Sequence, residues 1–307
     1  MMNETTYTAY FTPDEWTLRE SLYDQLAALA GDSLRSEDTE RIEALLIQAV
    51  EADRLERDSF GLNPIIKNLQ TALIVVDEMG MRRAAIVSIL LHDVVKNGFI
   101  TVEEAGKQFG ADVQGILSGL VRINKLYEKN PSIESENFRN LLLSFANDMR
   151  IILIMIAERL VLMRKIADSE NEEARQQVAR EASQLYAPLA HKLGFYKLKS
   201  ELEDLVIKYT EPEVYAELSR KLEETAASRE DYMANFIAPI EKSLLGNPHI
   251  KYRIKGRTKS IHSIWQKMQR QKSPFEKIYD IFAIRIIIDS EPANEKSECW
   301  QVYSLVT

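Results

Sequence analysis

Basic residues at alternate positions, followed by the start of a helix, are the feature of this sequence that best indicates chemistry. In KYRIKGRTKSIHSIWQKM, a strand's period of two puts four cations on one side. They are Lys251, Arg253, Lys255 and Arg257. The N–H groups and dipole of a helix N-terminus next to Arg257 and Lys259 attract phosphate. The pattern predicts a site for a polyphosphate chain.

The helix that follows should continue this basic surface. Ser260 is its expected N-cap, because its side-chain oxygen can accept from the first free N–H groups. At about 3.6 residues per turn, polar side chains share one broad stripe, with Ile264 and Met268 in the adjacent apolar rows. The stripe holds Lys259, Ser263, Lys267 and Arg270. The helix is therefore predicted to bury one side and expose a basic one.

The doublet His92-Asp93 in SILLHDVVKNG is a second candidate site. Neighbouring helical residues project about 100° apart, so both side chains can reach one metal ion if other helices supply further ligands. A purely structural role at the end of an apolar helix is the alternative. The doublet alone does not decide between the two.

Composition narrows the class of protein. The 307 residues are 45% hydrophobic and 28% charged, which is typical of a globular chain long enough for two domains. A net charge of −8 argues against a DNA-binding protein and favours a local basic face for a small anionic ligand. The single cysteine, Cys299, excludes an internal disulfide framework. Short apolar runs and a polar start predict a cytoplasmic protein with no membrane partner.

The hydrophobic pattern predicts helices throughout the first part of the chain. Apolar residues recur at three- and four-residue spacing up to Leu245, and the pattern changes at Gly246-Asn247-Pro248. A strand, a helix and a strand follow, and CWQVYSLV near the end is expected to be one more strand. The strands of this last unit are expected to lack partners. The predicted helices span 17–30, 38–51, 63–78, 82–96, 101–109, 138–167, 170–193, 198–209 and 212–244.

Long segments of the chain resemble the long Rel/SpoT homologue family. GRTKSIHSIWQKM and FEKIYDIFAIRIII are similar to the start of its (p)ppGpp synthetase domain. ILLHDVVKNG, IAERLVLMRKI and YAPLAHKLGFYKLKSELEDL resemble the HD-type (p)ppGpp hydrolase and connecting helices that precede it. The resemblance implies a mostly α fold. Its expected parts are an all-helical HD-type domain (1–196), a helical bridge (197–246) and an incomplete α/β nucleotidyltransferase-like synthetase domain (247–307).

The same resemblance implies roles for residues of the basic segment. Arg257 would contact the adenine and phosphates of ATP, and Lys259 and Lys267 would hold the triphosphate, with Ser263 on the same face. Asp280 would coordinate Mg²⁺. Arg285 stands in the apolar run IFAIRIII, so it is expected to be a buried or pocket-lining cation with phosphate as its partner.

The reaction that the family performs is pyrophosphate transfer from ATP to the 3′-hydroxyl of GTP or GDP, in the stringent response. The parent protein is therefore expected to be a GTP pyrophosphokinase, an ATP:GTP 3′-diphosphotransferase. Its general base and a guanine-stacking tyrosine are expected beyond Thr307, so this fragment is expected to be truncated and inactive. Contacts with the ribosome or tRNA are expected only through C-terminal domains that this chain lacks.

The HD-type part departs from the family at its metal ligands. The family's hydrolases hold Mn²⁺ with the doublet, an earlier histidine and a later aspartate, and these last two fall on Asn63 and Glu158. An amide is a weaker ligand than imidazole, so Mn²⁺ is not expected here. The catalytic Glu-Asp pair of the family falls on Lys96-Asn97.

Lys96 lies four residues after His92 and three after Asp93, which puts its ammonium within reach of the same patch. We expect Lys96 to pair with Asp93 in place of the metal and to leave a folded pseudo-hydrolase. A solvated lysine at a helix end is the alternative.

A nucleotide pocket could persist in the HD-type part without its chemistry. The guanine-stacking arginine of the family falls on Arg54, near Arg57, whereas an asparagine close to the nucleotide falls on Leu162. Solvent-facing residues of a charged helix are the other interpretation of Arg54 and Arg57. Two further functions thus stay open: a non-catalytic module that binds guanosine nucleotides such as (p)ppGpp, and residual metal-dependent (p)ppGpp 3′-pyrophosphohydrolysis.

Overall fold

The computed structural model describes residues 4–129, 148–169, 171–247, 250–279 and 281–306. The chain divides into two compact units, Met1–Tyr209 and Thr210–Thr307. The boundary falls inside the segment 197–246 that the sequence predicts as a bridge. Among the described residues no helix is long and apolar enough to cross a membrane.

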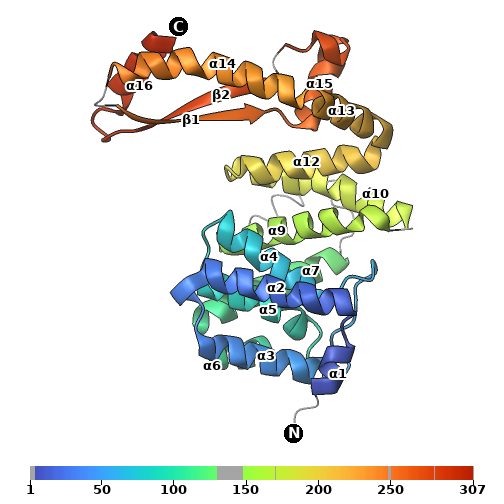
Figure 1. Cartoon of the computed structure of the whole chain (residues 1–307). Coiled ribbons are helices and arrows are strands. Elements are labelled where there is room, and N and C mark those ends of the chain that lie inside the picture. The colour runs from blue at the N-terminus through green and yellow to red at the C-terminus, as the bar shows by residue number, and fades with distance from the viewer. Residues whose placement is uncertain (1–3, 130–147, 170, 248–249, 280, 307) are drawn as a thin grey trace. The chain divides into compact units, whose positions relative to one another are not determined.

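Helices joined by turns and loops make up the described part of the first unit (Figure 1). The predicted helices are observed there within a few residues of their expected ends, whereas the helices Glu4–Ala9 and Ala111–Lys129 were not predicted. The first part of the predicted helix 138–167, up to residue 147, lies outside the described residues. The helices are α1 (Glu4–Ala9), α2 (Pro13–Ala30), α3 (Ser36–Glu51), α4 (Pro64–Asp77), α5 (Arg83–Lys96), α6 (Val102–Phe109), α7 (Ala111–Lys129), α9 (Met149–Lys165), α10 (Glu172–Glu181), α11 (Ala187–Lys192) and α12 (Tyr196–Thr210), with a π-helical segment at Ala182–Tyr186.

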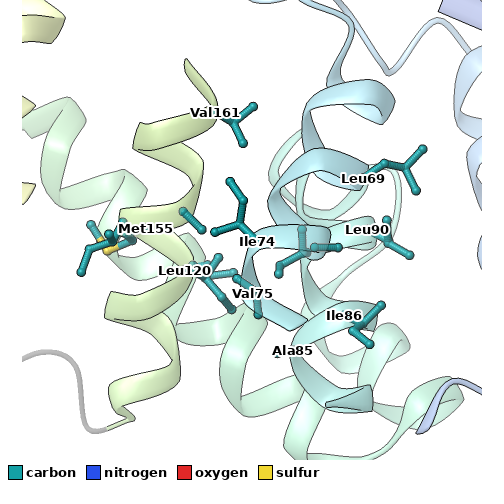
Figure 2. Close-up of a cluster of buried hydrophobic side chains, with 14 of the residues drawn as sticks. Leu69, Ile74, Val75, Ala85, Ile86, Leu90, Leu120, Met155 and Val161 are labelled. Carbon is teal, nitrogen blue, oxygen red and sulfur yellow. The ribbon is translucent and has the colours of Figure 1, made fainter. Parts of the chain in front are cut away.

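Helix α5 runs through the core of this unit and carries the His-Asp doublet. All its residues from Ala85 to Val95 are buried, because α4, α7 and α9 pack around it. Figure 2 shows side chains from these four helices meeting in one apolar cluster. Its labelled members are Leu69, Ile74, Val75, Ala85, Ile86, Leu90, Leu120, Met155 and Val161. The packing encloses His92 and Asp93, which lie in the last turn of α5, among side chains of α4, α7 and α9.

The second unit combines helices with a sheet of two strands, which are separated in the chain by a helix. Strands β1 and β2 pair antiparallel, so that Lys251 lies opposite Asp289 and Thr258 opposite Phe282. The elements are α13 (Pro212–Glu224), α14 (Ala226–Leu245), β1 (Lys251–Thr258), α15 (Ile261–Gln271), β2 (Phe282–Asp289) and α16 (Glu295–Val306). The expectation of a mostly α chain is confirmed, whereas the strands expected to lack partners pair with each other.

The two faces of this sheet differ as the alternation in the sequence predicts. Tyr252 and Ile254 of β1 pack with isoleucines of β2 against α14 and α16. Figure 1 shows α14 running along the two strands. Gly256 leaves room for α14, since a Cβ atom there would collide with the Met233 side chain. The four alternate cations of β1 lie exposed on the opposite face.

The prediction of a strand at CWQVYSLV is wrong, because this segment is part of helix α16. Val302, Leu305 and Val306 are three and four residues apart, so they share one side of a helix. That side packs on Ile240 and Leu244 of α14. A short apolar run without clear alternation fits a strand and a buried helix equally well, and the packing partner decides between them.

Candidate functional site

The basic groove of the second unit is built on helix α15 and the end of β1. Ser260 caps α15 as predicted, because its Oγ accepts from the backbone N–H of Ser263 at 3.3 Å. Ile261 and Ile264 are buried against Leu218 and Phe275, which fixes the rotation of the helix. The opposite, polar side of α15 is therefore presented to solvent.

An open groove of about 660 Å³ follows this polar side. Four residues that the sequence predicts to contact ATP line this groove: Arg257, Lys259, Ser263 and Lys267. The lining residues are Arg257, Lys259, Ser263, Trp265, Gln266, Lys267, Gln269 and Arg270. Cations, one hydroxyl and side-chain amides are the groups that bind a phosphate chain by charge and hydrogen bonds.

Arg285 and Asp280 stand apart from this groove. Arg285 is exposed, not buried, because the register of β2 puts it on the outer face directly opposite Lys255. It is not among the residues that line the groove. Of the two expectations for Arg285, a buried or a pocket-lining cation, burial is therefore wrong, while its role toward phosphate stays a prediction. Asp280, the expected Mg²⁺ ligand, lies outside the described residues.

The His-Asp doublet of the first unit lies beside a cavity of about 300 Å³, where α4, α5, α7 and α9 supply its neighbours. His92 Nδ1 is 2.9 Å from Oε1 of Glu158, and His92 Nε2 is 2.9 Å from the Asn124 amide nitrogen. An amide can only donate through its nitrogen, so Nε2 accepts and Nδ1–H donates to the carboxylate. Both ring nitrogens are thus engaged by side chains of the protein.

Asp93 is held by two residues of α4. The Lys67 ammonium lies 3.3 Å from its Oδ2, and the Asn68 amide donates to the same oxygen at 3.0 Å. Lys96 is exposed, and no ion pair joins it to Asp93 among the described residues. The expectation that Lys96 pairs with Asp93 is therefore wrong, because Asp93 is buried on the side of α5 that faces α4, whereas Lys96 lies at the exposed end of the helix.

The charges of this network stabilise one another despite their burial. Burial by itself raises the pKa of Asp93, but the Lys67 ammonium, with weaker help from His92 and Lys96, brings it below its ordinary value. Burial likewise lowers the pKa of Lys67, and the carboxylates of Asp93 and Glu158 more than compensate. The pKa of His92, lowered by burial, is raised overall by Glu158. A buried ion pair persists only with such mutual compensation.

Asn63 serves the fold of α4 in this structure. Its side-chain oxygen caps the helix by accepting from the N–H groups of Ile65 at 3.0 Å and Ile66 at 3.4 Å. It is not among the residues that line either cavity beside the doublet. Leu162, where the family places an asparagine, does line the cavity that His92 and Glu158 line.

A second cavity, of about 380 Å³, adjoins Asp93 on the side of the loop after α3. Its cationic lining residues are Arg54, Arg57, Lys67 and Lys96, accompanied by Asn97. Arg54 and Arg57 lie in this loop, because α3 already ends at Glu51. The alternative interpretation is therefore wrong about a charged helix, but both residues are solvent-exposed, as it expects.

These two arginines differ in their partners. Arg57 is engaged by both carboxylate oxygens of Glu15 at 2.7 Å. The Arg54 backbone accepts a hydrogen bond from the Asn97 amide at 2.8 Å. Of the two, Arg54 is thus the one whose guanidinium is not committed to an ion pair that the structure records.

The residues around the doublet do not fit a divalent metal ion. No group of three or more His, Cys, Asp or Glu side chains among the described residues is arranged to hold one. An ammonium group already lies against Asp93, and both nitrogens of His92 have partners. A second cation would be repelled there.

Sequence reasoning missed three residues of this site: Lys67, Asn68 and Asn124. Lys67 and Asn68 are the polar pair inside NPIIKNLQTALIVV, an otherwise apolar helix. Polar residues on a buried helix need partners, and that signal was available. The sequence does not identify their partner, since Asp93 lies 25 residues beyond Asn68 on another helix.

Comparison with known families gives one match for each unit. Residues 44–196 match the HD domain, and residues 256–307 match the region found in RelA and SpoT proteins. An HD domain followed by a RelA/SpoT region is the class of protein that these matches define.

Curated relatives carry two kinds of name. The guanosine-3′,5′-bis(diphosphate) 3′-pyrophosphohydrolase of Aquifex aeolicus is 35% identical over 79% of this chain and 34% of its own length. The GTP pyrophosphokinase of Myxococcus xanthus is 33% identical over 76% of this chain and 30% of its own. The bifunctional (p)ppGpp synthase/hydrolase SpoT of Escherichia coli is 28% identical over 92% of this chain and 39% of its own length. The matches and these names support a member of the Rel/SpoT family. The chain spans about a third of the length of these relatives.

Proposed function

We propose that this chain is part of a (p)ppGpp synthetase, which transfers pyrophosphate from ATP to the 3′-hydroxyl of GTP or GDP, and that its HD domain is catalytically inactive. The groove at β1 and α15 is the single observation on which the synthetase assignment rests. Arg257, Lys259 and Lys267 line it together with the hydroxyl of Ser263. Residues 247–307 then belong to an α/β domain of the nucleotidyltransferase type, and residues 1–196 to the HD domain.

The chemistry of the transfer suits such a groove. The 3′-oxygen of the acceptor forms a bond to the β-phosphorus of ATP, the bond to the α-phosphate oxygen breaks, and AMP leaves. The protein must hold two polyanions in line and offset their charge, which fixed cations do without reorganisation. Mg²⁺ held by Asp280 would neutralise phosphate charge when bound.

The contacts of the doublet support the second part of the proposal. Hydrolysis in this family uses a divalent metal, and here Asp93 is engaged by Lys67 and Asn68. The catalytic Glu-Asp pair of the family falls on Lys96 and Asn97 in this chain. An ammonium and an amide cannot replace these carboxyl groups as general acid and base. The HD domain is then a folded partner of the synthetase, without turnover of its own.

Calorimetric titration with a non-hydrolysable ATP analogue tests the synthetase assignment. We expect saturable binding that Lys267→Ala weakens at least about tenfold, which corresponds to the loss of one charge-assisted contact. Lys242→Ala, an exposed lysine on α14 outside the groove, should bind as the unsubstituted chain does. Equal binding by both variants would contradict the assignment of the groove.

Incubation with ppGpp and Mn²⁺ tests the inactivity of the HD domain. No release of pyrophosphate and no formation of GDP is expected over the time in which an active hydrolase consumes its substrate. Manganese-dependent GDP formation that His92→Ala abolishes would overturn this part and leave the ATP site unaffected.

Binding of a guanosine nucleotide without catalysis is a second candidate function. The cavity of about 380 Å³ beside the loop after α3 favours it, because four cations, Arg54, Arg57, Lys67 and Lys96, line it. The carboxylates of Asp53, Glu56, Asp58 and Asp93 line the same cavity. Titration with ppGpp tests this candidate, and Arg54→Ala should then weaken binding. No heat of binding with ppGpp would exclude it.

A further inference from the structure

Two carboxylates are enclosed beside the doublet, and one lysine serves both. Asp93 is 7% exposed, and the Glu158 side chain retains about a fifth of its surface. The Lys67 ammonium lies 3.3 Å from Asp93, and it attracts Glu158 and Asp58 as well. An enclosed carboxylate is stable only with a compensating cation and donors for its remaining lone pairs.

Two amides complete the arrangement at the positions that the lysine does not reach. Asn68 donates to Asp93, and Asn124 donates to Nε2 of His92. Glu158 in turn accepts from Nδ1 of the same ring. Each of the groups that a metal ion would contact therefore has a donor supplied by α4, α5 or α7.

We propose that the Lys67 ammonium is the built-in cation of this site, that it makes the helical unit independent of a divalent metal, and that its removal leaves a site that takes Mn²⁺ or Mg²⁺ from solution. The carboxylates of Asp93 and Glu158 then require an external cation. The inference rests on the proposal that the HD domain has no metal chemistry, but it concerns Lys67, which no sequence argument singled out.

Thermal unfolding of the full chain with and without MnCl₂ or MgCl₂ tests this, after treatment with a chelator. The unsubstituted chain should show the same midpoint with and without the metal. Lys67→Met keeps the length of the side chain and removes its charge, so it should lower the midpoint by roughly 10 °C in the absence of metal. Millimolar MnCl₂ should restore a large part of this loss.

A matched control lies on the same cavity. Lys96→Met removes the same charge from its rim, but Lys96 is exposed and makes no ion pair with Asp93. This variant should keep the midpoint within a few degrees and show no response to metal. A metal response equal to that of Lys67→Met would mean that net charge alone is responsible, which would overturn the proposal.

Two further results keep the proposal testable if Lys67→Met does not fold. The double variant Lys67→Met/Asp93→Asn removes both members of the pair, so it should fold, be more stable than Lys67→Met, and ignore MnCl₂. A double variant as unstable as the single one would overturn the proposal. Stoichiometric binding of Mn²⁺ by the unsubstituted chain that Asp93→Asn abolishes would overturn it as well. ATP binding in the groove of the second unit is unaffected by either outcome, so failure here is distinguishable from failure of the synthetase assignment.

Discussion

The Lys67 ammonium lies 3.3 Å from the Asp93 carboxylate, joining α4 to the helix that carries the His-Asp doublet. This pair disfavours a metal ion in two ways. The Lys67 ammonium supplies the positive charge that a metal would bring, and it engages Asp93, a potential metal ligand. This contact supports the proposal that the HD domain is catalytically inactive.

The protonation of His92 depends on Glu158. Glu158→Gln should lower the pKa of His92, because the carboxylate at 2.9 Å is what raises it against the effect of burial. With its folded pKa above the ordinary 6.5, protonated His92 adds stability below that pH, and the gain is lost as pH rises through the folded value. An NMR titration of the imidazole measures the pKa. Glu201→Gln, on the exposed ion pair with Arg164, is the control and should leave it unchanged.

Arg19 is expected to hold the first helices together. Its guanidinium carbon lies 4.8 Å from the ring centre of Tyr23, 5.0 Å from that of Trp16 and 5.4 Å from that of Tyr7, and it pairs with Glu43. Arg19→Ala removes these contacts and leaves the Glu43 carboxylate with the Tyr23 hydroxyl but without a compensating cation, so it should cost about 3–5 kcal/mol of unfolding free energy. Urea denaturation measures it.

Arg41→Ala is the control for this loss. Arg41 forms an exposed i,i+4 pair with Glu37, so its removal should change stability by about 0.5 kcal/mol or less. Equal losses in the two variants would mean that the aromatic surroundings of Arg19 contribute nothing.

The pair of Asp38 and Arg83 predicts a dependence on acid. Burial raises the pKa of Asp38, but two hydrogen bonds from Arg83, at 2.6 and 2.7 Å, bring it below 3.8. A lowered folded pKa means that the stabilisation is present above 3.8 and is lost as pH falls through the folded value. Asp38→Asn should therefore cost about 1.5–3 kcal/mol near neutral pH and progressively less in acid. A constant difference between pH 7 and pH 2 would contradict the assignment.

Two glycines of α7 should respond oppositely to the same substitution. Alanine at Gly115 meets nothing within 4 Å, so the gain in helix propensity should stabilise the protein by up to about 1 kcal/mol. Alanine at Gly119 collides with Cδ1 of the buried Ile151 on α9, and overpacking should offset that gain or exceed it. Denaturation of both variants measures the difference. Equal stabilisation would show that α7 and α9 do not pack this closely.

Lys255 and Arg285 face each other across the two strands, and like charges in this position repel. Lys255→Glu should therefore raise the stability of the second unit by about 0.5–1 kcal/mol, with a smaller gain at high salt. Inorganic tripolyphosphate should stabilise the unsubstituted chain more than the variant if this face binds phosphate. A loss of stability in Lys255→Glu would contradict the repulsion.

Local sequence patterns determined the secondary structure around the basic groove and the residues that lie together on single elements. Alternation in KYRIKGR predicts the strand and its exposed cations, and Ser260 predicts the start of α15, because strand period and helix capping depend only on neighbouring residues. The His-Asp doublet and the groove residues on α15 are predictable for the same reason, being a few residues apart on one element.

Only the tertiary structure decided which lysine compensates Asp93. Lys96 is near in sequence, but α5 directs Asp93 inward and Lys96 outward, and Lys67 arrives from α4 through packing of apolar surfaces. The same holds for α16, whose apolar residues form a helix because α14 offers them a face, and for Arg285, which strand register leaves exposed. Contacts between distant segments depend on how elements pack, and a sequence read residue by residue does not contain that geometry.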